Sequence, residues 1–437
     1  QSEAARWNIP GMTAAVLHDG TRERTATGVT NLEHPAPVTP ETRFQIGSIS
    51  KVYTATAVMA LVDQGVLDLD TPVWEWVPDL PLQRADAFAD LSLRHLLNHT
   101  TGFEGDYFFD EGDGDDALAK GIARFGEMRV WSEPGEIMAY CNTGFSLAGR
   151  IIELATGTTY EDAIQELIFE PLGMAASSFP STDLVTVPAA SGHTRSSPED
   201  GYAVNRPWEL PRFVNAAGGI VSTVDDMLTF AAMHLGDGTV AGSRVLSEDA
   251  AREMRVRTSS ADAFDDGYGV GWNITHTGGT ALVNHGGATN GFRAWLMTVP
   301  EHNFAIAILT NSEEGLKASE TIERWALRHY LGIERDVPEI IESDPATLDA
   351  WTGRYERHDA IIDIWRVDDH LHLEHRGIDA EETFSYQDLA DAPPVAFDFR
   401  PTGETGFVTP GSPVLAIATS CSTTSSATIA TTKATAK

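Results

Sequence analysis

Cysteine is scarce in this chain, and long apolar runs are missing from it. The two cysteines, Cys141 and Cys421, stand far apart in unlike surroundings. Two thiols are too few for a disulfide framework or a cysteine zinc site, and we interpret Cys141 as a small buried residue. No run of about 18 or more apolar residues occurs, so the sequence predicts no membrane-spanning segment.

Lysine is nearly absent, with five residues against 25 arginines, and acidic residues outnumber basic ones by 64 to 30. The resulting net charge of -34 repels nucleic acid and anionic lipid, so we expect neither as a partner. Two interpretations of the excess acid and scarce lysine stay open: adaptation to high salt, or a GC-rich genome that favours arginine codons over lysine codons. The chain starts at Gln1 and not at Met. A removed signal peptide and an extracytoplasmic location therefore stay open, and the localisation is left unassigned.

The order of patterns along residues 1–335 predicts one α/β domain. Residues 12–30 indicate two strands around an Asp19-Gly20 turn, and a helix follows from Ser48 to a stop at Gly65. Helical segments dominate residues 71–250, and one of them is stopped by Gly157. Strands return between 268 and 311, with a second hairpin over residues 292–311, and an amphipathic helix ends at Gly332. This order indicates an antiparallel sheet flanked by helices, with a helical subdomain.

The remaining residues change in character. Residues 336–347 have two prolines and little periodicity, which is typical of a linker. Residues 348–412 contain short alternating segments and predict a small all-β, barrel-like domain. Residues 413–437 are rich in Ser, Thr and Ala, and we expect this low-complexity tail to be disordered.

Ser48 and Lys51 form a candidate catalytic pair. At a helix start, residues i and i+3 share one face, and the helix dipole there favours negative charge. A serine hydroxyl becomes a strong nucleophile when a base removes its proton, and a lysine with a depressed pKa can be that base. The alternative is an N-cap serine with a solvated lysine, because Ser-x-x-Lys arises often by chance.

Two further short patterns could carry chemistry. In "AYCNTG", the phenol of Tyr140 can transfer a proton and the amide of Asn142 can hold a substrate carbonyl; the alternative is a loop entering a helix. In "NHGGATNGF", His285 precedes Gly286 and Gly287, which let a substrate backbone approach closely. The alternative there is a hairpin turn with an incidental histidine.

Taken together and in this order, these patterns resemble the serine β-lactamases and penicillin-binding proteins. The branch in question contains class C β-lactamases, D-aminopeptidases, DD-carboxypeptidases and esterases, and the resemblance covers about residues 5–335. The segments that carry it are "FQIGSISK", "LRHLLNHTTGF", "PGEIMAYCNTGF", "PLGMAASSF", "NAAGGIVSTVDDMLTF", "YGVGW" and "HGGATNGF". The resemblance implies a β-lactamase/transpeptidase-like fold, followed by a lipocalin-like C-terminal domain that opens at "LDAWTGRYER".

The resemblance also implies roles. Ser48 would accept the acyl group with Lys51 as its proton partner, and Tyr140 would be the general base or the proton shuttle to the leaving group. Asn142 would contact the substrate amide, and His285, Gly286 and Gly287 would complete the third motif. The backbone amides of Ser48 and Ala288 would form the oxyanion hole. No metal or other cofactor is expected.

His285 stands where the lactamases carry lysine, which favours a peptidase or amidase acting on a small-molecule or peptide substrate with D-amino acids. A carboxylesterase, a β-lactamase and an acylated sensor without turnover remain alternatives, and the oligomeric state is not predicted. We expect His285 to be mainly neutral at pH 7 and to donate a hydrogen bond, because Lys51 disfavours a second positive charge nearby.

Two polar segments could bind a metal ion, but each has a simpler interpretation. His370, His372 and Glu374 share one strand face and could bind a metal, but an exposed polar face is the favoured interpretation. The acidic segment 109–116 lacks the order of a calcium-binding loop, and we interpret it as a solvated loop beside the active site.

Overall fold

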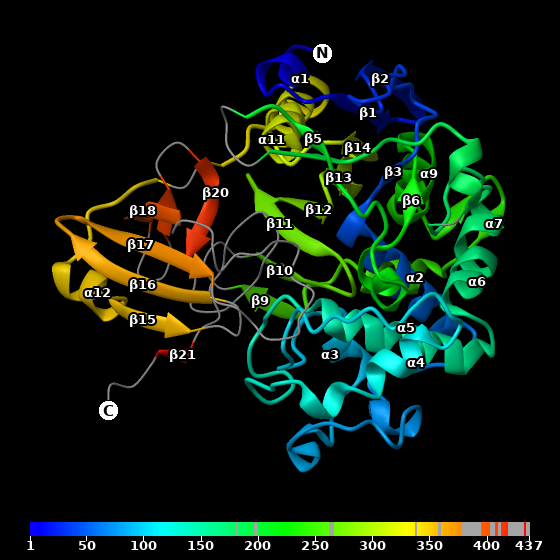
Figure 1. Cartoon of the computed structure of the whole chain (residues 1–437), viewed down its shortest axis with the longest axis horizontal. Helices are drawn as coiled ribbons and strands as arrows, with labels where there is room; N and C mark the ends of the chain where they lie inside the picture. Colours follow the sequence, from blue (N-terminus) through cyan, green and yellow to red (C-terminus); the bar gives the residue numbers. More distant parts are fainter. Residues whose placement is uncertain are drawn as a thin grey trace.

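The computed structural model describes residues 1–180, 182–195, 200–261, 266–336, 339–356, 360–377, 395–402, 407–409, 412–417 and 432–433. Its centre is an eight-stranded sheet in which every neighbouring pair is antiparallel, in the order β2-β1-β14-β13-β12-β11-β10-β9 (Figure 1). The strands are β1 Gly11–His18, β2 Thr21–Gly28, β9 Ser259–Ala261, β10 Asp266–Tyr268, β11 Asn273–Thr277, β12 Thr280–Thr289, β13 Phe292–Val299 and β14 Phe304–Thr310. The predicted α/β fold with a large antiparallel sheet is confirmed.

The first hairpin shows how the local sequence shapes this sheet. Asp19 and Gly20 both have positive φ, 48° and 76°, as a two-residue hairpin turn of the right twist requires. The central strand β14 alternates its side chains between two cores. Ala305, Ala307 and Leu309 join one core, whereas Phe304, Ile306 and Ile308 join the other.

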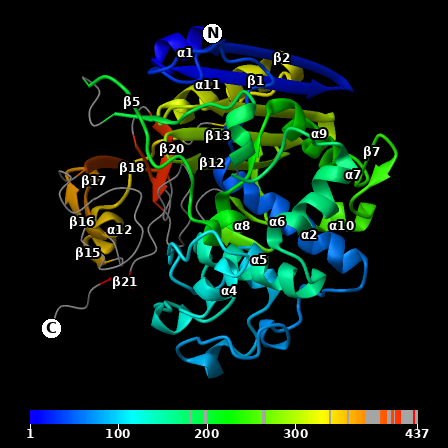
Figure 2. The same cartoon turned by 45° about the vertical axis from the view of Figure 1, so that its right-hand side comes forward.

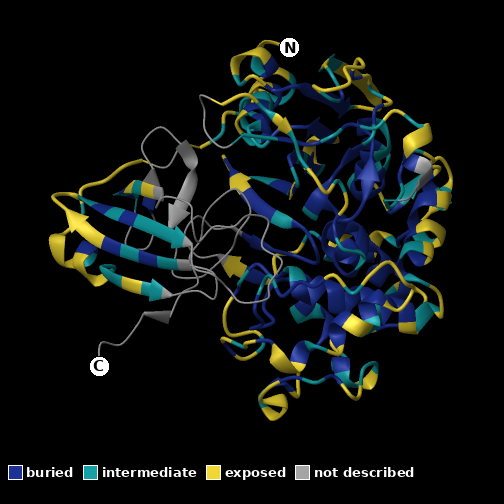
Figure 3. Cartoon of the chain, viewed as in Figure 1, coloured by how far each residue is buried: buried dark blue, intermediate teal, exposed yellow. Residues whose placement is uncertain are grey.

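Helices cover both faces of the sheet. Helices α2 (Ser50–Asp63) and α9 (Val224–Leu235) contribute to the larger core, and α11 (Gly315–Ala326) covers the opposite face with α1 (Ser2–Arg6) beside it (Figures 1 and 2). Every residue of α2 from Ser50 to Leu61 is buried (Figure 3). A helix buried on all sides has no polar stripe, so α2 is a central element of the fold.

The helical subdomain lies between β3 and β9 in sequence and packs around α2 (Figure 2). Its helices, with α10 at their end, are α3 Leu93–Leu97, α4 Ala117–Ile122, α5 Asn142–Thr156, α6 Tyr160–Ile164, α7 Glu170–Leu172, α8 Asn215–Gly218 and α10 Glu248–Glu253. Helix α5 ends at Gly157 and α2 is followed by Gly65, both with positive φ of 74° and 71°. The predicted glycine stops are therefore confirmed. None of the helices among the described residues is long and apolar enough to cross a bilayer.

Three pairs of short strands complete the main body. They are β3 Phe44–Gln45 with β6 Val221–Ser222, β4 His193–Thr194 with β5 Ala203–Val204, and β7 Thr239–Val240 with β8 Ser243–Arg244. The β3–β6 pair positions the chain immediately before Ser48.

After residue 336 the chain forms a second antiparallel sheet, which Figures 1 and 2 show beside the main body. The elements are α12 Pro345–Ala350, β15 Gly353–Glu356, β16 Ala360–Val367, β17 His370–Gly377, β18 Val395–Pro401, β19 Phe407–Thr409, β20 Ser412–Ile417 and β21 Thr432–Lys433. Strands β20 and β21 are the two ends of this sheet, so closure into a lipocalin-like barrel stays a prediction. Of the tail 413–437, residues 418–431 and 434–437 lie outside the described residues.

The two polar segments, residues 370–374 and 109–116, both contact other side chains of the protein. On β17, Leu371 and Leu373 face a small core, whereas the His372 Nδ1 atom lies 2.7 Å from an Asp398 carboxylate oxygen. Within the described part of the chain, no group of His, Cys, Asp and Glu side chains is suited to a metal ion. In the acidic segment, Glu111 accepts a hydrogen bond of 3.2 Å from Arg124.

Candidate active site

Ser48 and Lys51 meet where the chain enters α2. The sequence predicted an α-helix from Ser48, but residues Gly47–Ile49 form a 3-10 turn and the α-helix begins at Ser50. Gly47 has a φ of 52°, which bends the chain before the helix can start. Ser48 is partly exposed, Lys51 is completely buried, and the Lys51 Nζ atom lies 3.0 Å from Ser48 Oγ.

The Lys51 amine has a second partner, the carbonyl oxygen of Ala217 on α8, at 2.7 Å. Burial lowers the pKa of Lys51 to about 7, although the carboxylate of Asp106 acts in the opposite direction. Because an amine with this pKa is substantially neutral at pH 7, one N–H can bind the Ala217 carbonyl while the lone pair accepts the Ser48 proton. The pair can therefore act as a nucleophile with its own base.

Tyr140 ends the segment that leads into α5. The centre of its ring lies 5.0 Å from Lys51 Nζ, and the side chain is buried. Burial raises the pKa of Tyr140 well above its usual value, the nearby Tyr268 adds to the rise, and the Ser48 hydroxyl opposes it. The phenol is consequently protonated at neutral pH, so it can give a proton but cannot start the reaction as a base.

His285 lies on β12, on the sheet side of the site, and its ring centre is 6.2 Å from that of Tyr140. Burial, followed by the charge of Lys51, lowers the pKa of His285 to about 3. Its Nδ1 atom lies 2.6 Å from the Gly286 carbonyl oxygen, which can only accept, so Nδ1 carries the proton. The imidazole is neutral and donates, as expected, but to the protein's own backbone. Its buried Nε2, without a partner among the described residues, is left as an acceptor.

Gly287 in the third motif allows strand β12 to pack closely against the chain before Ser48. A Cβ atom on Gly287 would lie 1.9 Å from the Ile46 carbonyl oxygen, and one on Gly47 would lie 2.6 Å from the Ala288 nitrogen. The two backbone segments therefore touch, which brings Ser48 and Ala288 to neighbouring positions. Gly286 instead faces the indole of Trp295, at 3.3 Å from such an atom. A direct approach by substrate to Gly286 and Gly287 stays a prediction.

Asn142 is the first residue of α5, and its side-chain amide donates a hydrogen bond to the carboxylate of Asp106. Asp106 was missed in the sequence, where it shares the aromatic-rich segment 103–109 with a second acid, Glu104. Ala217 was also missed as a partner of Lys51, because a backbone carbonyl has no signature in the sequence.

His99 is a third residue that the sequence reading missed. Its ring stacks on Tyr140 with the centroids 4.3 Å apart, and Tyr268 meets it edge-on at 4.5 Å. The Nδ1 atom of His99 accepts the backbone N–H of Cys141 at 3.0 Å. Burial lowers the pKa of His99 well below its usual value, and the charge of Lys51 adds to this effect. His99 is therefore a neutral ring that supports Tyr140 from one side.

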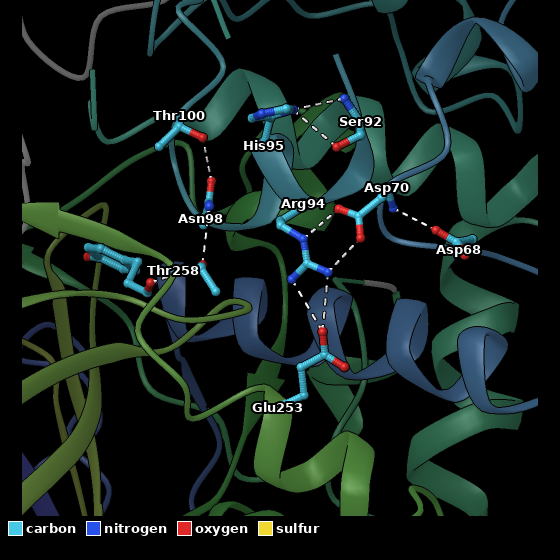
Figure 4. Close-up of polar contacts among 10 residues, drawn as sticks. Asp68, Asp70, Ser92, Arg94, His95, Asn98, Thr100, Glu253 and Thr258 are labelled. Atoms are coloured by element: carbon cyan, nitrogen blue, oxygen red, sulfur yellow. Dashed lines mark hydrogen bonds and ion pairs between the residues drawn. The ribbon is translucent and has the colours of Figure 1, made fainter. Parts of the chain in front are cut away.

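The segment that leads into His99 is anchored at two points (Figure 4). In α3, the guanidinium of Arg94 binds Asp70 at 2.6 and 2.9 Å and Glu253 at 3.3 Å. After the helix, the Asn98 side chain donates to Thr258 Oγ1 at 3.2 Å. These contacts join α3, α10 and the strand edge that carries Tyr268, so the rings around Tyr140 are held by distant parts of the chain.

Residues 1–330 match the model of the Beta-lactamase family. The chain is 33% identical to "Penicillin-binding protein 4" of Amycolatopsis lactamdurans over 80% of this chain and 94% of the relative. The crystal structure of SurE with D-Leu has a TM-score of 0.71 at 26% identity, covering 93% of this chain and 95% of SurE. The D-amino acid amidase of Ochrobactrum anthropi SV3, solved with D-phenylalanine, has a TM-score of 0.61 at 26% identity, covering 74% and 96%.

Proposed function

Since the chain belongs to the Beta-lactamase family of serine hydrolases, we propose that it hydrolyses amide bonds of D-amino-acid-containing peptides or amides through an acyl-enzyme on Ser48. The observation that carries this proposal is the 3.0 Å contact between Ser48 Oγ and the amine of a completely buried Lys51. A neutral amine at this distance can take the serine proton as the hydroxyl attacks.

The proposed reaction consists of the acylation and then the deacylation of Ser48. Ser48 Oγ attacks the substrate carbonyl carbon while its proton passes to Lys51, and the amides of Ser48 and Ala288 receive the negative charge on the oxygen. Tyr140 then gives its proton to the leaving nitrogen as the C–N bond breaks, and the Lys51 ammonium returns a proton to the phenolate. In deacylation, water attacks the carbonyl carbon of the Ser48 ester and gives up a proton to the same basic groups. Ser48 Oγ leaves and regains its proton, and the carboxylic acid product is released.

Two observations support a D-amino-acid amide as the substrate. The similar structures of SurE and the D-amino acid amidase hold D-Leu and D-phenylalanine respectively. In addition, the neutral His285 supplies no permanent positive charge to hold the carboxylate of a β-lactam, because its pKa is lowered to about 3.

The first prediction is that a fluorophosphonate labels Ser48. Intact-mass spectrometry should show one adduct on the native protein and on Ser50→Ala, and none on Ser48→Ala. Ser50 is the matched control because it is completely buried and its Oγ accepts the backbone N–H of Ile220 at 3.0 Å. Labelling that persists in Ser48→Ala would contradict the assignment of the nucleophile.

The second prediction concerns substrate class. We expect kcat/KM for a D-amino acid p-nitroanilide to exceed that for nitrocefin, because the β-lactam carboxylate meets a neutral His285. His285→Lys should raise the nitrocefin value by about 10-fold, the scale of one charge-assisted hydrogen bond. A native enzyme that already prefers nitrocefin by a large factor would be a β-lactamase, and a strong preference for p-nitrophenyl esters would make it an esterase.

A further inference from the structure

Asp106 places a carboxylate beside Asn142, in the segment between α3 and α4. Its position is fixed from both sides by the first turn of α5. The carbonyl of Gly105 accepts the backbone N–H of Asn142 at 2.8 Å, and Thr143 Oγ1 accepts the N–H of Tyr107 at 3.0 Å. A side chain on Gly105 would meet the Tyr140 carbonyl at 2.7 Å, so this backbone lies directly against the catalytic tyrosine segment.

One oxygen of the Asp106 carboxylate accepts a hydrogen bond, and the other can accept one from a ligand. Oδ1 accepts the Asn142 amide, whereas no hydrogen bond to Oδ2 is found within the described part of the chain. The side chain is half-buried and therefore reachable from solvent. The carboxylate is close enough to the machinery to raise the pKa of Lys51, Tyr140 and Cys141.

The other groups of the site leave this negative charge available. His99 and His285 are neutral at pH 7, because burial lowers both pKa values below the usual range. Lys51 is directed to Ser48 and Ala217, at 3.0 and 2.7 Å. A substrate cation placed near Asp106 would thus meet a carboxylate already oriented by Asn142, which is the arrangement of a charge-assisted hydrogen bond.

We propose that Asp106 binds the α-ammonium group of the substrate, so that the residue transferred to Ser48 is the amino-terminal one. The enzyme would then remove or deamidate an amino-terminal residue, as an aminopeptidase or amino acid amidase does, and would discriminate against N-acylated substrates. This inference rests on the proposed acyl-enzyme at Ser48 and specifies the substrate class of that same site.

The test compares D-alanine p-nitroanilide with N-acetyl-D-alanine p-nitroanilide at pH 6.5, where an α-amine with a pKa near about 7.7–8 is mostly charged. The native enzyme should prefer the free amine. In Asp106→Asn, the ratio of the two kcat/KM values should fall by about 10- to 100-fold, the scale of a hydrogen bond to a charged group. Asp110→Asn is the matched control, because Asp110 lies on the same segment but is exposed, and its ratio should equal the native one.

An unchanged ratio in Asp106→Asn, with both substrates slowed alike, would overturn the proposal and leave Asp106 as a support for Asn142. A native preference for the acetylated substrate would also overturn it. If Asp106→Asn does not fold, the native enzyme still decides: the ratio should fall as the pH rises above about 8 and the amine loses its proton. A missing fluorophosphonate adduct on native Ser48 would refute the acyl-enzyme itself, whereas an adduct with an unchanged ratio refutes only the ammonium site.

Discussion

Replacing Lys51 with methionine is expected to lower kcat by about 10²–10⁴-fold, the range for a lost general base. Methionine keeps most of the buried volume but has no basic nitrogen to take the Ser48 proton. Tyr140 cannot substitute, because its raised pKa keeps the phenol protonated at neutral pH. The measurement is steady-state hydrolysis of the preferred p-nitroanilide, with Lys120→Met as the control for losing an exposed lysine.

The pH profile of the native enzyme is a second test of Lys51 as the base. In the proposed mechanism the active form of Lys51 is the neutral amine, and burial lowers the pKa of this amine to about 7. For N-acetyl-D-alanine p-nitroanilide, which has no titrating amine, kcat/KM should therefore rise with pH and reach half of its maximum near pH 7. For the free-amine substrate, kcat/KM should fall again above about pH 8, where the α-amine loses its proton. The double variant Lys51→Met with Tyr140→Phe should be little slower than either single variant, since groups acting as one unit fail together. Normal turnover in Lys51→Met would place the base elsewhere.

A fall in pH should lower the free energy of unfolding, because buried histidines resist protonation in the folded state. The contribution of one such histidine, His234, can be measured separately. His234 lies on α9 with its Nε2 atom 3.1 Å from Thr56 Oγ1, and burial lowers its pKa to about 3. Below about pH 6.5 the unfolded chain binds a proton there that the folded chain does not. Stability is thus lost as the pH falls from 6.5 towards 3, by about 1.4 kcal/mol per pH unit for this one group.

The measurement is the free energy of unfolding by urea at several values of pH between 4 and 6. In His234→Gln, the slope of stability against pH should be shallower than the native slope by about 1.4 kcal/mol per pH unit. The variant also loses some stability at every pH, which does not affect the slope. His302→Gln, on an exposed turn, is the matched control and should keep the native slope. Identical slopes in both variants and the native protein would show that His234 becomes protonated in the folded state.

The local patterns of the sequence determined much of this protein. Strand-forming residues in 292–311 and the Asp19-Gly20 turn are enough to predict hairpins, because strand propensity and turn geometry are local properties of the chain. Glycine stops ended the helices α2 and α5 where expected, since positive φ is a property of one residue. The start of α2 was shifted to Ser50, because the left-handed Gly47 is set by the adjoining strand β12.

The chemistry of the site was decided by the tertiary structure. A Ser-x-x-Lys spacing puts two side chains on one face, but the burial that lowers the pKa of Lys51 comes from α5 and α8 packing around α2. Asp106, His99 and Ala217 reach the site through contacts with residues far away in the sequence, at separations of 36, 42 and 166 residues. Spacing along the chain holds no information about such approaches, because desolvation and charge depend on which segments the fold brings together.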